Sequence, residues 1–182
     1  MDLRNRRRLQ AALIAAIFAA PVIAAMLLTL AGWTPRGRSY GQPIRPERDL
    51  ASVPVKLADG RTFSWSNHDG VWTLVALPGP DCAERCLRQL DLAHRAQITL
   101  GKQTDKLLLL YLGDPPSGPA SQGFAAVWTL AGTASHELDD LRAHARDSVS
   151  AVLVSPKGEA LTRYPANFDA EGLRRDLKKV VR

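Results

Sequence analysis

The chain has 182 residues, of which 46% are apolar and 23% are charged, and its formal net charge is +6. These fractions are ordinary for a folded protein and argue against disorder or a coiled coil. Half of the net charge comes from Arg4, Arg6, Arg7 and Arg8 set against Asp2, and the other basic residues form no dense stripe with interleaved aromatics. The composition therefore predicts one globular domain of about 135 residues and gives no support for nucleic-acid binding.

The run from Ala11 to Trp33 contains no charged residue and is long enough to cross a bilayer. The arginines before it favour the cytoplasm, which places everything after Trp33 outside. A cleaved signal peptide is the alternative, because alanine-rich stretches inside the run resemble a cleavage site. The apolar run continues beyond them, so we expect an uncleaved single-pass anchor in the inner membrane at residues 10–33, preceded by a cytoplasmic tail at residues 1–9.

Residues 34–48 combine prolines and glycines with several arginines, a composition typical of a solvated linker. We therefore predict that the folded domain occupies residues 49–182. It opens with two short extended segments, residues 53–57 and 61–65. An Asp-Gly pair between them favours a hairpin turn.

Strands and helices are predicted to alternate through the rest of the domain. Short apolar runs indicate buried strands, and apolar residues at helical spacing indicate helices. The predicted strands are residues 71–77, 106–112, 125–130, 149–154 and 159–164, and the predicted helices are residues 82–100, 135–146 and 169–182. This order indicates an α/β fold in which a mixed sheet is flanked by helices.

The two cysteines of the chain, Cys82 and Cys86, lie where a predicted strand gives way to a predicted helix. Asp81 is suited to cap that helix and Glu84 to complete a capping box, which places Cys82 at the first helical position. The helix dipole and the exposed N–H groups there favour a thiolate, so we expect the pKa of Cys82 to fall. Cys86 follows one turn later with a Cα separation of about 6 Å, so the pair can form a disulfide or, when reduced, hold Cu(I).

Two simpler roles for the cysteine pair stay open. The disulfide could serve only to stabilise the fold, although a loop of so few residues constrains the unfolded chain little. The thiols could also be unrelated core residues, although the first lies at an exposed helix start. An oxidising compartment outside the membrane and the position at a helix start together favour redox or metal chemistry.

Four stretches of the extramembrane part carry a family resemblance: VWTLVALPGPDCAERC, LLLLYLG, VWTLAGTASHELDDLRAHAR and AVLVSPKGEALTRYP. Together with the predicted anchor they resemble the Sco/SenC proteins, and the CxxxC spacing is the most specific element. That family is thioredoxin-like, membrane-tethered and associated with assembly of the copper site of cytochrome c oxidase. The resemblance implies a thioredoxin-like fold, copper, and a partner that is an oxidase subunit or another periplasmic thiol protein. It also implies that Cys82 and Cys86 are the metal-binding or redox thiols.

The chain departs from the family pattern at two positions. Leu87 stands where the family usually has a proline after the second cysteine. The resemblance also implies a third copper ligand, a histidine just before the strand that matches residues 151–154, but that place falls at about Asp147. His144 and His136 are the nearest substitutes, with His144 the candidate ligand, and an exposed, solvated histidine is the alternative for both.

Two functions follow from these residues. The first is a membrane-anchored accessory protein for oxidase copper-centre assembly, which passes Cu(I) or acts as a thiol–disulfide oxidoreductase. In the latter case Cys82 attacks and Cys86 resolves the mixed disulfide. The missing third ligand disfavours stable Cu(II) binding and so favours thiol–disulfide exchange over copper transfer. The second function is a degenerate thioredoxin-like interaction module whose disulfide is structural and which has no catalytic activity.

Overall fold

The computed structural model describes residues 13, 16–24, 26–27, 39–116 and 121–181, which fall into two units, Met1–Arg38 and Ser39–Arg182. In the first unit the described backbone at residues 16–24 is helical. In the described part of the chain, no helix has the length and apolar character needed to span a membrane. Much of the anchor predicted at residues 10–33, and all of the predicted tail, lies outside the described residues.

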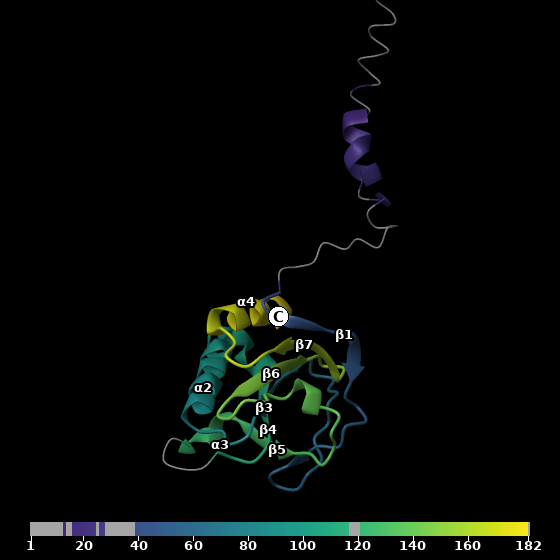
Figure 1. Ribbon diagram of the computed structural model, residues 1–182. Coiled ribbons are helices and arrows are strands. Elements are labelled where there is room, and N and C mark those ends of the chain that lie inside the picture. Colours follow the sequence, from purple (N-terminus) through teal and green to yellow (C-terminus); the bar gives the residue numbers. More distant parts are fainter. Residues whose placement is uncertain (1–12, 14–15, 25, 28–38, 117–120, 182) are drawn as a thin grey trace, which may run out of the picture. The chain divides into compact units, whose positions relative to one another are not determined.

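In the second unit, residues 39–116 and 121–181 form a seven-stranded mixed sheet with the order β1-β7-β6-β3-β4-β5-β2 (Figure 1). Strand β4 runs parallel to β3 and β5, whereas the other neighbouring pairs are antiparallel. The strands are β1 (Gln42–Asp49), β2 (Lys56–Leu57), β3 (Trp72–Pro78), β4 (Leu107–Leu112), β5 (Thr129–Gly132), β6 (Val149–Val154) and β7 (Glu159–Tyr164). The helices are α2 (Glu84–Ile98), α3 (Phe124–Val127) and α4 (Ala170–Val180), with 3₁₀ segments η1 (Gly101–Lys106) and η3 (Asp139–Leu141).

Side chains that alternate along the central strands separate two hydrophobic layers. On β3, Leu74 and Ala76 belong to one layer, and Val75 and Leu77 to the other, as the two-residue period of a strand requires. Helices α2 and α4 contribute their buried residues to the first layer and pack against each other (Figure 1). The mixed sheet with flanking helices expected from the sequence is therefore confirmed.

The second layer is closed by irregular chain. Val53 and Trp65, from the segment before β3, and Leu141, from η3, are buried in it. Trp65 donates its indole N–H to the carbonyl oxygen of Val53 at 2.9 Å, which satisfies its polar atom inside the layer. This segment also contains the predicted Asp-Gly turn, where Gly60 has a left-handed φ of +84°.

The predictions for the central strands and the closing helix are confirmed. Strands β3, β4, β6 and β7 differ from the predicted ranges by at most one residue at each end. Helix α4 begins at Ala170, and the carboxylate of Asp169 accepts the N–H of Gly172 at 2.7 Å. Leu173 and Leu177 of this helix are fully buried against the sheet.

The predicted linker is wrong from Gln42 onward, because Gln42–Asp49 forms the edge strand β1 and pairs with β7. The ladder is interrupted between Pro43 and Arg48, so the proline-rich stretch lies on an edge where missing N–H donors are tolerated. The start of the unit is fastened to α4, because the buried carboxylate of Asp176 accepts the N–H of Gly41 at 2.9 Å.

The helix predicted at residues 135–146 is also wrong, since only η3 is helical there. Leu138 of this segment is buried in the second layer. The guanidinium of Arg142 donates to the carbonyl oxygens of Pro78 and Leu112 at 3.0 and 3.1 Å. These contacts hold the segment along the carboxyl ends of β3 and β4 in place of helical hydrogen bonds.

The strand predicted at residues 125–130 is instead a helical turn, α3, followed by β5. Phe124 packs edge-on against Tyr111, with ring centroids 5.1 Å apart, and stacks on Trp128 at 6.0 Å. Residues four apart lie on the same face of a helix, so aromatic packing favours one helical turn before the strand. Trp128 is buried in the layer that lies under α2 and α4.

Candidate functional site

Cys82 and Cys86 form a disulfide at the start of α2, with their Cα atoms 5.2 Å apart. This separation lies inside the range that a disulfide can bridge, and the predicted pairing of the two thiols is observed. Cys86 is completely buried in the layer under α2, whereas Cys82 is only partly buried. The two cysteines are therefore unequally buried, and Cys82 is the more accessible of the two.

Helix α2 begins at Glu84, later than the sequence predicted. Asp81 has a left-handed φ of +54°, unlike the extended backbone usual for an N-cap residue, and its carboxylate pairs with Arg146 at 2.5 Å. The N-cap position is held by Ala83, which makes no side-chain capping bond. The predicted capping box is therefore wrong, and Cys82 lies before the helix instead of at its first position.

The cap of α2 is supplied by Asp147, which lies in a distant turn. One carboxylate oxygen accepts the N–H groups of Ala83 at 2.8 Å and Cys86 at 3.0 Å, and the other accepts that of Arg85 at 3.0 Å. The Arg85 side chain adds a contact at 3.3 Å. Burial opposes ionisation of this carboxyl, but the donors, led by the N–H of Cys86, outweigh it and lower the pKa of Asp147 to about 2. The carboxyl is therefore charged at neutral pH.

Sequence reasoning missed the role of Asp147. The residue stands at the place where the family resemblance implies a ligand histidine, yet both of its oxygens are bonded to the cysteine loop. The N–H groups on which the prediction of a stabilised Cys82 thiolate rested donate to this carboxylate instead. Because 61 positions separate Asp147 from Cys86, no local spacing could have signalled the contact.

The two histidines considered as substitute ligands are both exposed. The side chain of His136 is 91% exposed, and its Nδ1 lies 2.7 Å from Asp139 Oδ2. His144 lies in the loop before β6 and not on a helix. Among the described residues, no three or more His, Cys, Asp or Glu side chains form a group that could hold a metal ion. Neither histidine therefore joins the cysteines in such a group.

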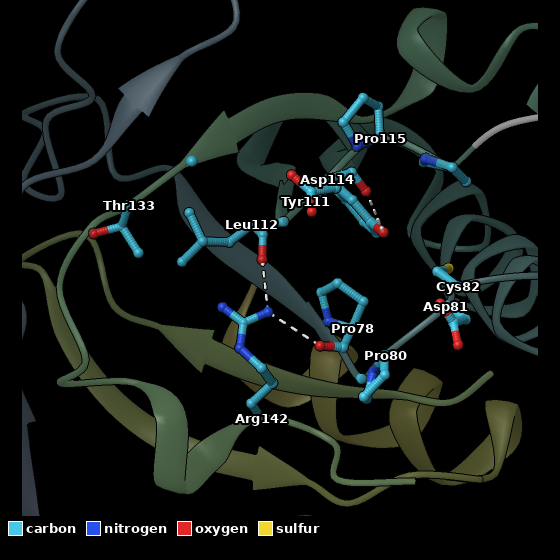
Figure 2. A pocket seen from close by; sticks show the side chains of 14 residues that line it. Pro78, Pro80, Asp81, Cys82, Tyr111, Leu112, Asp114, Pro115, Thr133 and Arg142 are labelled. Atoms are coloured by element: carbon cyan, nitrogen blue, oxygen red, sulfur yellow. Dashed lines mark hydrogen bonds between the residues drawn. The ribbon is translucent and has the colours of Figure 1, made fainter. Parts of the chain in front are cut away.

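A cleft of about 570 Å³ opens beside the disulfide (Figure 2). It lies at the carboxyl ends of β3, β4 and β5, the edge at which sheets of this class bind ligands. Its walls are formed by Pro78–Cys82, Tyr111–Pro116, Gly132, Thr133 and Arg142. Cys82 lines the cleft and Cys86 does not, so the cleft gives access to the less buried member of the pair.

Two polar side chains of the cleft are held in place by backbone carbonyl groups. Figure 2 shows Arg142 donating to the carbonyl oxygens of Pro78 and Leu112. Tyr111 donates its hydroxyl to the carbonyl oxygen of Asp114 at 3.0 Å, and burial raises its pKa to about 12. The cleft therefore presents a fixed cation and a neutral phenol beside the exposed cysteine.

The sequence matches the family model described as "Transmembrane-like, thioredoxin-like, C-terminal domain" over residues 72–182. No curated protein is significantly similar to the chain in sequence. Among solved structures, it is similar to BsSco, a member of the Sco family of cytochrome c oxidase assembly proteins, with 17% identity and a TM-score of 0.52 over 78% of this chain and 96% of that one.

A second similar structure is a putative thiol:disulfide interchange protein DsbE from Chlorobium tepidum, with 14% identity and a TM-score of 0.50 over 78% of this chain and 97% of that one. A third is Arabidopsis thaliana ScoI with copper bound, with 17% identity and a TM-score of 0.49 over 78% and 98% of the two chains. At these identities the likeness to BsSco and to the DsbE protein shows the fold alone. The thioredoxin-like fold expected from the sequence is confirmed.

Proposed function

Because the chain belongs to the family of transmembrane-like, thioredoxin-like C-terminal domains, we propose that it exchanges disulfides with thiol proteins outside the cytoplasm through Cys82 and Cys86. The unequal exposure of the bonded pair carries the proposal. A partner sulfur reaches Cys82 through the cleft, whereas burial shields Cys86 from direct attack. Exchange depends on which sulfur is accessible, so the exposed cysteine reacts with the partner and the buried one resolves.

The proposed exchange balances atoms and electrons as follows. In the reduced protein, the Cys82 thiolate attacks one sulfur of a partner disulfide; that disulfide breaks, and a mixed disulfide forms. The partner's other sulfur leaves as a thiolate and takes up a proton. Cys86 then attacks Sγ of Cys82, releases the second partner thiol and restores the internal disulfide. The partner gains two electrons and two protons, which the cysteine pair loses.

We assign the partner to the assembly of the oxidase copper centre, as a cytochrome c oxidase subunit or another periplasmic thiol protein. The family resemblance of the CxxxC segment supports this assignment. BsSco, which shares the fold, is described as carrying a disulfide switch, and the DsbE protein of the same fold is described as a putative thiol:disulfide interchange protein. Both descriptions support exchange chemistry on this scaffold.

Transfer of Cu(I) as cargo is the second candidate, favoured by the closeness of Cys82 and Cys86. After reduction, two thiolates suit this soft ion. The described residues provide no third ligand beside them, so this candidate is confined to Cu(I) held by the two sulfurs. The reduced full-length protein should retain one equivalent of Cu(I) after desalting, and Cys82→Ser should retain none. Failure of the reduced wild type to retain copper would remove this candidate.

The proposal also places the domain outside the inner (plasma) membrane, with residues 10–33 as a single-pass anchor and residues 1–9 in the cytoplasm. The charge-free run and the arginine cluster before it support this orientation. Alkaline phosphatase fused to the C-terminus, which is active only outside the cytoplasm, should be active in cells. An inactive but intact fusion would contradict the orientation.

Trapping of mixed disulfides tests the exchange reaction. In Cys86→Ser the resolving thiol is absent, so covalent adducts between Cys82 and partner proteins should accumulate. Cys82→Ser, which keeps the buried thiol, should form none. A wild-type protein that exchanges with neither oxidised glutathione nor periplasmic thiol proteins would exclude the proposal and favour an interaction module with a structural disulfide.

A further inference from the structure

The disulfide and the carboxylate of Asp147 hold the same short segment of chain. The disulfide ties Cys82 to Cys86. Of the residues in this loop, Ala83, Arg85 and Cys86 each donate their backbone N–H to Asp147. Most of the loop is therefore ordered twice, once by a covalent bond and once by a carboxylate from outside it.

The turn that carries Asp147 is itself fixed to the chain just before the cysteines. The connecting contacts are the Asp147 N–H to the Pro80 carbonyl at 2.9 Å, the Gly79 N–H to the Ser148 carbonyl at 2.9 Å, and Arg146 Nε to the Asp81 carboxylate at 2.9 Å. The two segments touch closely, since a Cβ on Gly79 would lie 2.4 Å from the carbonyl oxygen of Ala145. None of these contacts involves a sulfur atom, so none depends chemically on the bond between the sulfurs.

The disulfide and the hydrogen bonds to Asp147 order the same residues, so they stabilise each other. Each one reduces the conformational entropy that the chain still has to lose when the other forms. We infer that these contacts persist in the dithiol and keep the Cα atom of Cys82 near its 5.2 Å distance from the Cα atom of Cys86 in the disulfide. Less conformational freedom is then lost when the disulfide forms. Asp147 is thus a positioning residue that shifts the equilibrium of the cysteine pair toward the disulfide by about tenfold or more.

This inference deepens the proposed function, on which it rests in treating the Cys82–Cys86 bond as reversible. A residue that only stabilised the fold would stabilise the oxidised and reduced proteins equally. Its removal would lower the thermal stability of both forms and leave the redox equilibrium unchanged, by thermodynamic linkage. The redox equilibrium is therefore the measurement that separates positioning from general stabilisation.

The test compares full-length wild type, Asp147→Ala and Asp147→Asn in mixtures of reduced and oxidised glutathione, with dithiothreitol for forms that glutathione does not reduce. The fraction of disulfide is measured by thiol alkylation and mass spectrometry. In Asp147→Ala the equilibrium constant for disulfide formation should fall at least tenfold, which raises the reduction potential by about 30 mV. In Asp147→Asn this equilibrium constant should fall less, because asparagine keeps the side-chain shape and one acceptor oxygen.

Asp140→Asn is the matched control, because it removes a carboxylate that pairs with Arg48 at 2.8 Å and has no contact with the cysteine loop. Its equilibrium constant should stay within twofold of wild type. Values within twofold of wild type for both Asp147 variants would overturn the inference, and Asp147→Asn alone decides if Asp147→Ala does not fold. The wild type could be reduced by dithiothreitol and yet exchange with no partner thiol. That result would contradict the proposed function, but the ratio of the equilibrium constants of variant and wild type would still test the role of Asp147.

Discussion

Helices α2 and α4 pack together on one face of the sheet, and an aspartate caps each of them by a different route. The cap of α4 is local, because Asp169 accepts the N–H of Gly172 from the same stretch of chain. The cap of α2 is remote, because Asp147 reaches N–H groups more than sixty positions earlier. A local cap can form with its helix, whereas a remote cap exists only once the two segments have met.

The difference between the two caps bears on function, since only the carboxylate of the remote cap contacts the cysteine loop. The start of α2 is held by the turn before β6, so the geometry of the cysteine loop depends on a second part of the sheet. A change in that turn therefore acts on the N–H of Cys86 directly through the carboxylate of Asp147. At the start of α4 the capping carboxylate is local, although the N–H of Asp169 also donates to the hydroxyl of the distant Tyr40 at 2.6 Å.

The largest effects on stability should come from the buried faces of the two helices and not from their caps. Leu90 of α2 and Leu177 of α4 are 1% and 0% exposed, and replacing such residues by alanine costs about 2–5 kcal/mol. Leu90→Ala and Leu177→Ala should each lower the free energy of unfolding in urea by that amount. The control Leu92→Ala, at a side chain that is 37% exposed, should cost under about 1 kcal/mol.

The two caps should differ next. Asp147→Ala removes the acceptor of three N–H groups and should cost about 2 kcal/mol, whereas Asp169→Ala removes the acceptor of one and should cost about 1 kcal/mol. Urea unfolding of the oxidised proteins measures both values. If Asp169→Ala lowered the free energy of unfolding as much as Asp147→Ala or more, the prediction would be wrong, because the number of N–H donors would then not determine how much a cap stabilises its helix.

Acid should weaken the remote cap. The pKa of Asp147 is about 2 in the folded protein, against an ordinary value of 3.8 for an aspartate, so folding favours the charged form. Its contribution is complete above about pH 4 and is lost as the pH falls through about 2. The difference in free energy of unfolding between wild type and Asp147→Asn should therefore shrink between pH 5 and pH 2. A difference that stays constant over this range would show that ionisation of Asp147 does not stabilise the fold.

The smallest effect should come from the ion pair between Arg146 and Asp81. The two side chains are 81% and 63% exposed, and exposed pairs of this kind contribute about 0–1 kcal/mol. Arg146→Gln should lower the free energy of unfolding by less than Asp147→Ala does, and the loss should shrink further in 0.5 M salt. If Arg146→Gln lowered the free energy of unfolding as much as Asp147→Ala does, the Arg146–Asp81 ion pair, and not only the Asp147 carboxylate, would hold the start of α2 in place.

The sequence predicted those parts of the site and fold whose signal is local. The apolar runs of β4 and β6 stand between clear turn residues, and the spacing of Leu173 and Leu177 marks the buried face of α4. The pairing of Cys82 with Cys86 follows from a separation of four residues. The same reasoning failed for the segment that carries His144, because it predicted a helix where the structure has a loop.

By itself, then, the sequence determined where the cysteine pair lies and which segments form the centre of the sheet, because residue spacing and hydrophobic period act within a few residues. Only the tertiary structure decided that β1 extends the sheet, that residues 135–146 follow its edge, and that Asp147 caps α2. Each of these depends on carbonyl, amide or carboxylate groups brought together from distant parts of the chain. The cysteine loop is thus one short segment of sequence, but its geometry also depends on a second segment, the turn that carries Asp147.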